Sequence, residues 1–220
     1  MATAVIGVGN IGKTVAGHLA TGGEPVVLAA DSASSAEAAA EDVGSGASAT
    51  SVGDAIAGAD AVIFAVWFDV MKELIAQHTD LLAGKVVIDP SNAVGSDEKG
   101  GFAPTLPDGV SAGSVIAGLL RDGAHFVKAF GTLSAPSLAS AANQTPRVAL
   151  FYCTDDDAAA TAVERLIRAA GFDPVNAGGL DQASRIEMFG DLHEFGGLDG
   201  KLLNADEARA AVTQPGSGER

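Results

Sequence analysis

The chain has 220 residues, of which 47% are hydrophobic and 5% aromatic, and its formal net charge at pH 7 is −15. This length fits one domain with a small appendage, and the apolar share is large enough to build a buried core. The excess of acidic side chains repels nucleic acid and anionic membrane surfaces, so we expect neither as a partner.

The sequence lacks the marks of export, membrane insertion and covalent cross-linking. Its start, MATAVIGVGN, has no basic segment followed by a long apolar stretch, so we expect no signal peptide. No apolar run reaches the roughly 20 residues that span a bilayer. Cys153 is the only cysteine, which excludes an intrachain disulfide and a thiolate metal cluster. We therefore expect a cytoplasmic protein that does not interact with membranes.

Short apolar runs rich in Val and Ile alternate with longer Ala-rich stretches. The runs lack strict polar alternation and are bounded by Gly, Asp or Pro, which is typical of strands buried on both faces of a parallel sheet. We predict strands at 3–8, 25–30, 60–66, 85–90, 125–130 and 147–153. We predict helices at 11–21, 36–42, 53–58, 69–83, 113–122, 158–170, 181–195 and 204–212. This order predicts an α/β fold with a doubly wound, mostly parallel sheet and a small C-terminal helical extension.

Composition changes along the chain suggest how it is divided. We expect a dinucleotide-binding domain over residues 1–154, a strand and helix extension packed on it over 155–212, and a flexible tail over 213–220. The stretch 91–109 is rich in Gly and Pro and is too long for an ordinary connection. We interpret it as a functional loop or a lid.

The segment AVIGVGNIGKTVAGHLA places Gly7, Gly9 and Gly12 in the spacing G-x-G-x-x-G, directly after a predicted strand and before a predicted helix. In this context the first glycine permits a tight turn, the second lets the backbone approach a pyrophosphate, and the third lets helix and strand pack closely. The helix N-terminus offers N–H groups and a positive dipole to the diphosphate. This predicts a Rossmann-type NAD(P) site; the alternative is a Gly-rich turn without a ligand.

Asp31 ends the second predicted strand, about 20 residues after Gly12, where an acid hydrogen-bonds the ribose 2′-OH of NAD. An NADP site needs a cation there, and the sequence has no Lys or Arg between Lys13 and Lys72. Electrostatics therefore favour NAD, because a carboxylate repels a 2′-phosphate. The alternative is that Asp31 only ends the strand and that the phosphate points to solvent among nearby serines such as Ser32.

Five segments together resemble the F420H2:NADP oxidoreductases, a family of NADPH-dependent reductases of coenzyme F420. They are IGVGNIGKTVAGHLA, DAVIFAVWFDV, VVIDPSNAV, HFVKAFGTLSA and FDPVNAGGLDQASRIEMFG, and they extend over nearly the whole chain. The resemblance implies a Rossmann domain with a small C-terminal helical extension. It also implies direct hydride transfer between the nicotinamide and the deazaflavin ring of coenzyme F420.

The resemblance further implies which residues bind the two ligands. Those expected at the diphosphate are Gly7, Val8, Gly9, Asn10, Ile11 and Gly12. Those expected at the riboses and the nicotinamide are Ala65, Val66, Trp67, Phe68, Asn92 and Ala129, and the position after the second strand adds Asp31 and Ser32 to them. Those expected at the second substrate are Ser91, Lys128 and Thr132. We expect no catalytic side chain, because hydride transfer between two held rings requires proximity and orientation.

Two residues depart from the family pattern. Asp31 stands where the family commonly has an arginine for the 2′-phosphate, so the residues favour NAD while the resemblance favours NADP. Gly131 stands where the family often has an asparagine, in KAFNT. That exchange removes a polar side chain near the expected nicotinamide face.

Charge also bears on the second substrate. Coenzyme F420 carries a phosphate and glutamates, so an acidic protein needs local cations to hold it. The candidates are Lys99, Arg121, Lys128, Arg147 and Arg185. Lys128 is the best of them because it precedes the strand end at AFGT, although for each cation the alternative is a solvated surface charge.

Other residues and functions remain open. His193 and Glu194 suggest acid–base chemistry, with packing at a cleft or subunit surface as the alternative. The four histidines have no metal-binding spacing, so we expect no metal. Besides deazaflavin reduction, the candidate functions are reduction of another small acceptor (a flavin, imine or quinone) and a non-catalytic NAD(P)-binding module for redox sensing or interaction. The extra C-terminal helices suggest a homodimer.

Overall fold

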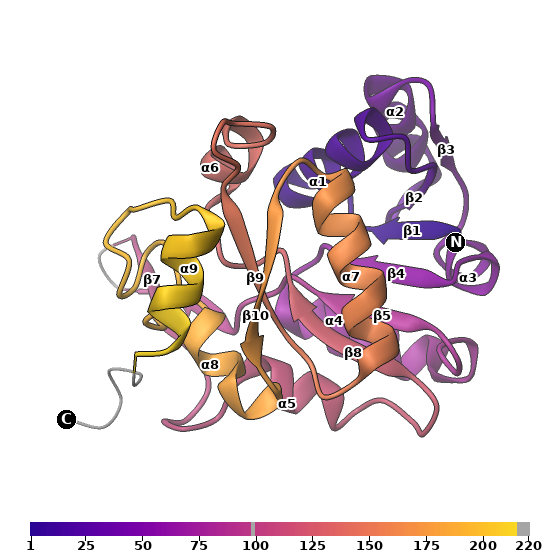
Figure 1. Ribbon diagram of the computed structural model, residues 1–220. Coiled ribbons are helices and arrows are strands. Elements are labelled where there is room, and N and C mark those ends of the chain that lie inside the picture. Colours follow the sequence, from indigo (N-terminus) through magenta and orange to yellow (C-terminus); the bar gives the residue numbers. More distant parts are fainter. Residues whose placement is uncertain (98–99, 215–220) are drawn as a thin grey trace.

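The structure is a computed structural model that describes residues 1–97 and 100–214 (Figure 1). Within these residues, one sheet has the strand order β10-β9-β8-β5-β4-β1-β2-β3, and β6 and β7 form a separate hairpin. The strands are β1 (Thr3–Ile6), β2 (Val26–Ala29), β3 (Ala47–Ala49), β4 (Ala61–Phe64), β5 (Val86–Asp89), β6 (Val94–Ser96), β7 (Phe102–Pro104), β8 (His125–Ala129), β9 (Ala149–Cys153) and β10 (Asp173–Gly178). The predicted α/β fold with a doubly wound, mostly parallel sheet is confirmed.

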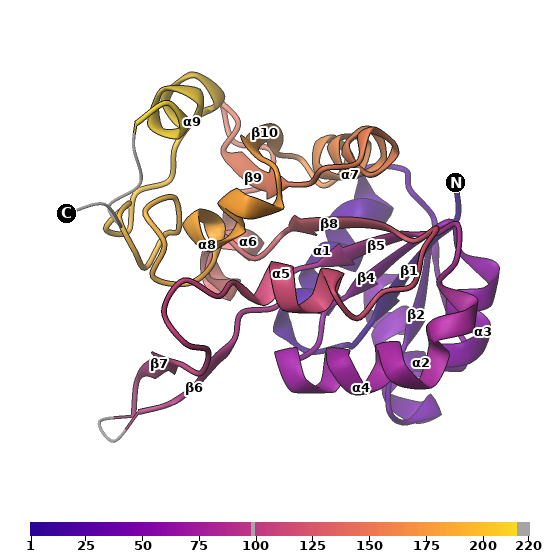
Figure 2. The same cartoon turned by 90° about the horizontal axis from the view of Figure 1, so that it is seen from below.

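Helices cover both faces of this sheet, which lies between them in Figure 2. The helices on one face are α1 (Asn10–Thr21), α2 (Ala33–Val43), α6 (Ala135–Ser140) and α7 (Asp157–Ala169). Those on the other are α3 (Val52–Gly58), α4 (Phe68–His78) and α5 (Ala112–Ala117). Those packed beside β9 and β10 are α8 (Ala183–Ile186) and α9 (Ala205–Val212). In the described part of the chain, no helix is long and apolar enough to cross a membrane.

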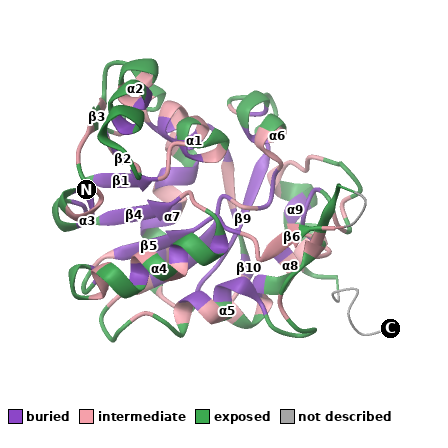
Figure 3. Ribbon diagram, turned by 180° about the vertical axis from the view of Figure 1, so that it is seen from behind, coloured by how far each residue is buried: buried purple, intermediate pink, exposed green. Residues whose placement is uncertain are grey.

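Burial on both faces explains the continuous apolar runs. Along β1, Val5 belongs to the buried cluster that includes Leu19 of α1. Its neighbour Ile6 points to the opposite face and belongs to the cluster that includes Ile56 of α3. Neither face of the strand meets water, so no position along it selects a polar side chain. Figure 3 shows the strands as the buried centre of the molecule and the outer helix surfaces as exposed.

The last two strands are reversed relative to the rest of the sheet. β5 pairs with β8 in parallel, but β9 pairs with β8 in antiparallel, and β10 follows β9 in parallel. The reversal follows from the connection after β8, whose helix α6 packs on α1 instead of returning along the sheet. β9 therefore starts from the edge at which β8 ends.

The predicted helix over 181–195 is wrong. The chain forms a 3-10 turn, η2 (Leu180–Gln182), and the short α8, and then leaves helical geometry. Phe189 has a φ of 74°, which a right-handed helix cannot contain. The N–H of Met188 donates to Oδ1 of Asn92 at 2.7 Å. This tertiary hydrogen bond and local turn bonds, such as that from the N–H of Gly190 to the carbonyl of Glu187, thus replace helical ones, and the apolar spacing gave no sign of them.

Smaller differences concern short elements. β3, α6 and the β6-β7 hairpin were not predicted, because a three-residue strand such as ASA has no β-branched or apolar signal. The hairpin lies inside the stretch 91–109. In place of the predicted helix 69–83, the structure has α4 followed by a 3-10 turn, η1 (Thr79–Leu81). The predicted helix 204–212 is confirmed as α9, capped by Asn204. Positions 215–220 of the expected tail lie outside the described residues, and the expected domain boundary at 154 stays a prediction.

Asp156 fixes the start of α7 against β8. Its Oδ1 accepts the N–H of Ala159 at 2.9 Å, and its Oδ2 lies 2.6 Å from Nδ1 of His125. The hydrogen bond from His125, followed by that from Ala159, lowers the pKa of Asp156 below its usual range. A lowered native pKa means that this stability is present above the unfolded pKa of about 3.9 and is lost as the pH falls through the native pKa.

We predict that Asp156→Ala lowers the free energy of unfolding by about 1 kcal/mol at neutral pH, the usual effect of removing an N-cap. The difference from wild type should shrink as the pH falls below about 4 and through the lowered native pKa, where the folded carboxylate becomes protonated. Urea unfolding followed by circular dichroism measures both. Asp157→Ala is the matched control, because this exposed acid lies one residue further on and makes no cap. Equal losses in the two variants would contradict the prediction.

Candidate functional site

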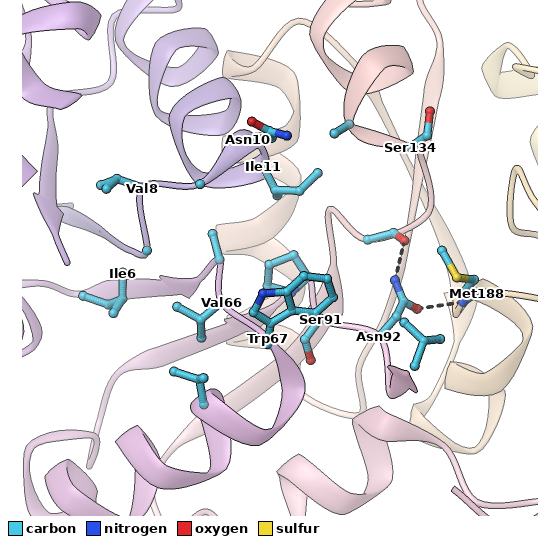
Figure 4. Close-up of a pocket in the computed structure, with 18 of the residues that line it drawn as sticks. Ile6, Val8, Asn10, Ile11, Val66, Trp67, Ser91, Asn92, Ser134 and Met188 are labelled. Carbon is cyan, nitrogen blue, oxygen red and sulfur yellow. Dashed lines mark hydrogen bonds between the residues drawn. The ribbon is translucent and has the colours of Figure 1, made fainter. Parts of the chain in front are cut away.

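A cavity of about 870 Å³ lies at the sheet edge where β1, β4, β5 and β8 end. This volume is typical of small-molecule sites, and doubly wound sheets bind ligands at this edge. In Figure 4, Ile6 and Val8 lie on one side of the indole of Trp67, and Met188 lies on the other. The predicted site residues that line the cavity are Gly7, Val8, Gly9, Asn10, Ile11, Asp31, Ala65, Val66, Trp67, Ser91 and Asn92.

The glycine-rich loop between β1 and α1 forms one wall. Gly7 has a φ of 98°, and a side chain there would collide with the carbonyl of Ala65. A side chain at Gly12 would collide with the carbonyl of Gly7, so α1 starts directly against the turn. At Gly9, by contrast, the space of a Cβ is open. Gly9 is the N-cap of α1, and no side chain caps this helix. The loop therefore leaves room and backbone donors for an anion.

Asp31 lies just after β2 at the same wall. Its side chain is exposed, and its Oδ1 accepts the N–H of Ser32 at 2.9 Å. Ser32 in turn caps α2, where its Oγ accepts the N–H of Ser35 at 3.2 Å. Lys13 of α1 pairs with Asp42 at 3.0 Å. Of the described residues that line the cavity, none is Lys or Arg.

A buried ion pair holds the loop that follows β5. Nζ of Lys128 lies 2.8 Å from Oδ2 of Asp89, and it also donates to the carbonyl of Ser91. The other oxygen of Asp89 accepts the N–H of Ser91 at 2.7 Å. Lys128 is 2% exposed and does not line the cavity. Its contacts therefore fit a residue that positions the loop, and they do not bring it to the substrate side as expected.

Ser91 presents an unused hydroxyl to the cavity. The residue is 6% exposed and lines the wall, yet its Oγ has no hydrogen-bond partner among the described residues. A buried polar atom without a partner costs free energy, and native structures rarely leave one. The hydroxyl is therefore available to a ligand.

Asn92 joins the loop to the C-terminal segment. Its Nδ2 donates to the carbonyl of Gly131 at 3.2 Å, and its Oδ1 accepts the N–H of Met188 at 2.7 Å, as the dashed lines in Figure 4 show. A side chain at position 131 would stand 2.5 Å from the carbonyl oxygen of Pro90. The asparagine that the family often has there does not fit this backbone.

His193 binds the same backbone carbonyl as Asn92. Its Nε2 lies 3.1 Å from the carbonyl of Gly131, and its Nδ1 accepts the N–H of Phe195 at 2.9 Å. These partners require a neutral ring protonated at Nε2. Burial lowers the pKa of His193 below its ordinary value, which also favours the neutral ring. Both nitrogens are engaged, so the contacts indicate a residue that ties the C-terminal segment to the sheet and not an acid or base.

Glu194 anchors this segment a second time. Its Oε2 accepts the N–H of Ser134 at 2.6 Å, and its Oε1 accepts the hydroxyl of Ser137 at 2.6 Å. The carboxylate thus lies at the start of α6, where negative charge is favourable. Its place is structural, and it does not line the cavity.

Six predicted site residues do not line the cavity: Gly12, Ser32, Phe68, Lys128, Ala129 and Thr132. Phe68 and Ala129 belong to the buried clusters on the two faces of the sheet. The side chain of Thr132 is buried, while its carbonyl accepts the N–H of Glu194 at 3.1 Å. Sequence position placed these residues at strand ends, but it could not say which way their side chains point.

Several lining residues were not expected from the sequence. They are Val70, Phe102, Leu133, Ser134, Met188 and Phe195. Phe102 and Phe195 stand in the Gly-rich segments GGFAP and HEFGG, and both are about half exposed. A large aromatic residue inside a turn-forming sequence was the one signal that could have identified them.

The expected cations are not at the cavity. Arg121 pairs with Asp80, and Arg185 pairs with Asp191 at 2.9 Å. Neither these two nor the exposed Arg147 lines the cavity, and Lys99 lies outside the described residues. Over residues 1–97 and 100–214, no group of three His, Cys, Asp or Glu residues could hold a metal ion.

Comparisons with known proteins agree with this geometry. The model of the family described as NADP oxidoreductase, coenzyme F420-dependent, matches residues 2–93. A hypothetical protein from Sinorhizobium meliloti is similar with a TM-score of 0.80 and 28% identity, over 93% of this chain and 95% of that chain. A candidate F420-dependent NADP-reductase from Arthrobacter sp. FB24 has a TM-score of 0.69 and 24% identity, over 82% and 86% of the two chains.

Likeness also extends to larger reductases. An imine reductase from Streptomyces aurantiacus has a TM-score of 0.60 and 22% identity, and it matches 83% of this chain but only 57% of its own. This likeness shows the fold alone. The family match is more specific, because residues 2–93 include the glycine-rich loop, Asp31 and the loop after β5. Residues 2–93 thus match the model of the coenzyme F420-dependent NADP oxidoreductase family, and the chain is a Rossmann-type oxidoreductase of the NAD(P)-dependent class.

Proposed function

We propose that this protein transfers hydride between a nicotinamide dinucleotide and a deazaflavin ring of the coenzyme F420 type. The observation that carries the proposal is that one cavity is bordered both by the glycine-rich loop and by the loop after β5 and the C-terminal segment. A dinucleotide on the first wall leaves the second wall for an acceptor ring. The family description names both NADP and coenzyme F420, which supports this pairing.

The residues present fit a dinucleotide. Gly9 leaves open space beside the uncapped start of α1, where Val8, Asn10 and Ile11 would hold the diphosphate. Ala65 and Val66 would border the riboses, and Trp67, which lies between Val8 and Met188 in Figure 4, would stand between the dinucleotide and the acceptor. The nicotinamide would supply or accept the hydride at the carboxyl edge of the sheet, where Ser91 and Asn92 lie. The acceptor ring takes the hydride together with one proton from water, so the reaction balances without a protein acid.

We propose NAD(H) as the preferred dinucleotide, although the family name points to NADP. Asp31 lines the cavity and its carboxylate is exposed, so it can accept a hydrogen bond from a ribose 2′-OH. The same carboxylate repels a 2′-phosphate. Lys13, on the adjacent helix, is already paired with Asp42.

Two other functions are the alternatives to this one, and they differ from it in whether the protein reduces an acceptor and in which acceptor it reduces. The same fold occurs in an imine reductase, so reduction of a flavin, imine or quinone is the alternative reaction. A non-catalytic NAD(P)-binding module would bind the dinucleotide without turnover. The expected homodimer and cytoplasmic location also stay predictions, and light scattering of the purified protein tests the first.

The proposed function is tested by following NADH absorbance with coenzyme F420 as acceptor. We expect NADH oxidation that depends on both compounds. Turnover with an imine or quinone and none with a deazaflavin would support the alternative reaction. Binding of NADH without turnover of any acceptor would support the non-catalytic module.

We predict that Gly12→Ala weakens NADH binding by at least about tenfold, because the new methyl group forces α1 away from the turn at Gly7. Isothermal titration calorimetry measures the affinity. Gly17→Ala is the matched control: it lies in the same helix with open space around its Cβ. This control should raise helix stability by about 0.5–1 kcal/mol and leave the affinity unchanged. If both variants bind NADH like wild type, the loop does not hold the diphosphate.

We predict that wild type binds NADH at least about tenfold more tightly than NADPH, and that Asp31→Arg reverses the order. A hydrogen bond to a charged group contributes about 1.5–3 kcal/mol, which is roughly 10- to 100-fold in affinity. Parallel calorimetric titrations with NADH and NADPH measure the ratio. Glu37→Arg makes the same charge change on the exposed face of α2 and should leave the ratio near that of wild type. If wild type prefers NADPH, Asp31 does not bind the ribose 2′-OH of the dinucleotide.

A further inference from the structure

The acceptor wall of the cavity is apolar and aromatic. Trp67 is 63% exposed, Phe195 54%, Phe102 49% and Val70 40%, and all four line the cavity. They come from three separate segments of the chain: α4 with its N-cap, β7 and the C-terminal segment. Large exposed apolar side chains gathered at one cavity mark a binding surface, and aromatic rings favour stacking with a planar ligand.

Charged groups are almost missing from this wall. Asp31 is the only residue with a formal charge among the described residues that line the cavity, if histidine is neutral. His193 is held neutral by the Phe195 N–H that its Nδ1 accepts. A phosphate or carboxylate held by a protein is normally paired with Arg or Lys in charge-assisted hydrogen bonds. The described residues that line the cavity offer no such partner.

Three cations on neighbouring elements already have partners. Lys72 of α4 donates to Asp69 at 2.9 Å, and Lys128 is buried with Asp89. Arg185 binds Asp191 and the carbonyl of Val212. To bind an anionic tail, any of these would have to leave its present partner. The net charge of −15 adds a long-range repulsion for anions.

Among the described lining residues, Ser91 offers a buried polar atom to the ligand. The buried Oγ of Ser91 lines the cavity and has no partner among the described residues. A hydroxyl can donate to a ring carbonyl, which flavin-type and quinone-type rings carry. The wall therefore combines stacking surfaces with one neutral hydrogen-bonding group.

Resting on the proposed function, we infer that the cavity selects an uncharged, planar acceptor ring. A deazaflavin whose tail carries no phosphate or carboxylate is then the better substrate, and coenzyme F420 itself is a poorer one. Apolar contact and the Ser91 hydroxyl supply the affinity, while an anionic tail finds no cation among the described residues that line the cavity.

Trp67 makes a direct binding test possible, because it is the only tryptophan of the chain and lies at the cavity. Quenching of its fluorescence is titrated with 5-deazariboflavin, which is uncharged, and with coenzyme F420. We expect 5-deazariboflavin to bind at least about tenfold more tightly at low salt, and the ratio to fall as salt screens the repulsion. Rates of NADH oxidation with the two acceptors should rank in the same order.

A matched pair of variants sharpens the test. Val70→Lys places a cation at the wall, and we expect it to favour coenzyme F420 over 5-deazariboflavin by about tenfold relative to wild type. Leu119→Lys makes the same charge change at an exposed apolar residue that does not line the cavity, and the ratio should stay that of wild type. Lys99→Ala should also leave the ratio unchanged.

Two results would overturn the inference. One is tighter binding of coenzyme F420 that weakens as salt is added, and the other is a selective loss of coenzyme F420 binding in Lys99→Ala. Either would leave the proposed hydride transfer to a deazaflavin intact. If neither ring quenches Trp67 or oxidises NADH, the proposed function fails and the inference fails with it.

Discussion

The cavity depends on one buried ammonium group. Lys128 Nζ lies under the loop after β5, bound to Asp89 and to the carbonyl of Ser91, with Oε1 of Glu187 4.0 Å away. Both charges of the Lys128–Asp89 pair are out of water, so removing either partner leaves an unpaired buried charge and typically costs about 3–5 kcal/mol. The pair thereby fixes the backbone from which Ser91 and Asn92 reach the cavity.

The loop that this pair holds is in turn bonded to the C-terminal segment. Asn92 holds the carbonyl of Gly131 and the N–H of Met188, so it joins β5, β8 and the C-terminal segment at one point. Glu187, next to Met188, caps α5 by accepting the N–H groups of Ala112 and Gly113 at 2.9 and 2.8 Å. The two walls of the cavity therefore have different origins. The nucleotide wall is built by local backbone turns, and the acceptor wall is built by contacts between distant segments.

This difference explains what the sequence could predict. The glycine-rich loop, the sheet and Asp31 at the strand end follow from local patterns, because turn geometry and strand burial are set by adjacent residues. The turns over 187–200 do not, because besides their local hydrogen bonds they depend on contacts with Asn92, Gly131 and Ser134 from far along the chain. Lys128 shows the same limit: its position at a strand end was visible, but its burial against Asp89 was not.

The anchoring of the C-terminal segment has a further consequence for binding energetics. Three side chains, Asn92, His193 and Glu194, attach the segment to the loops after β5 and β8 and to the start of α6. A wall held in this way is already ordered before a ligand arrives. Little conformational entropy is then lost when the ligand binds, so more of the stacking energy of its aromatic side chains remains as affinity. The segment that the sequence made hardest to predict is thus the preorganised part of the cavity.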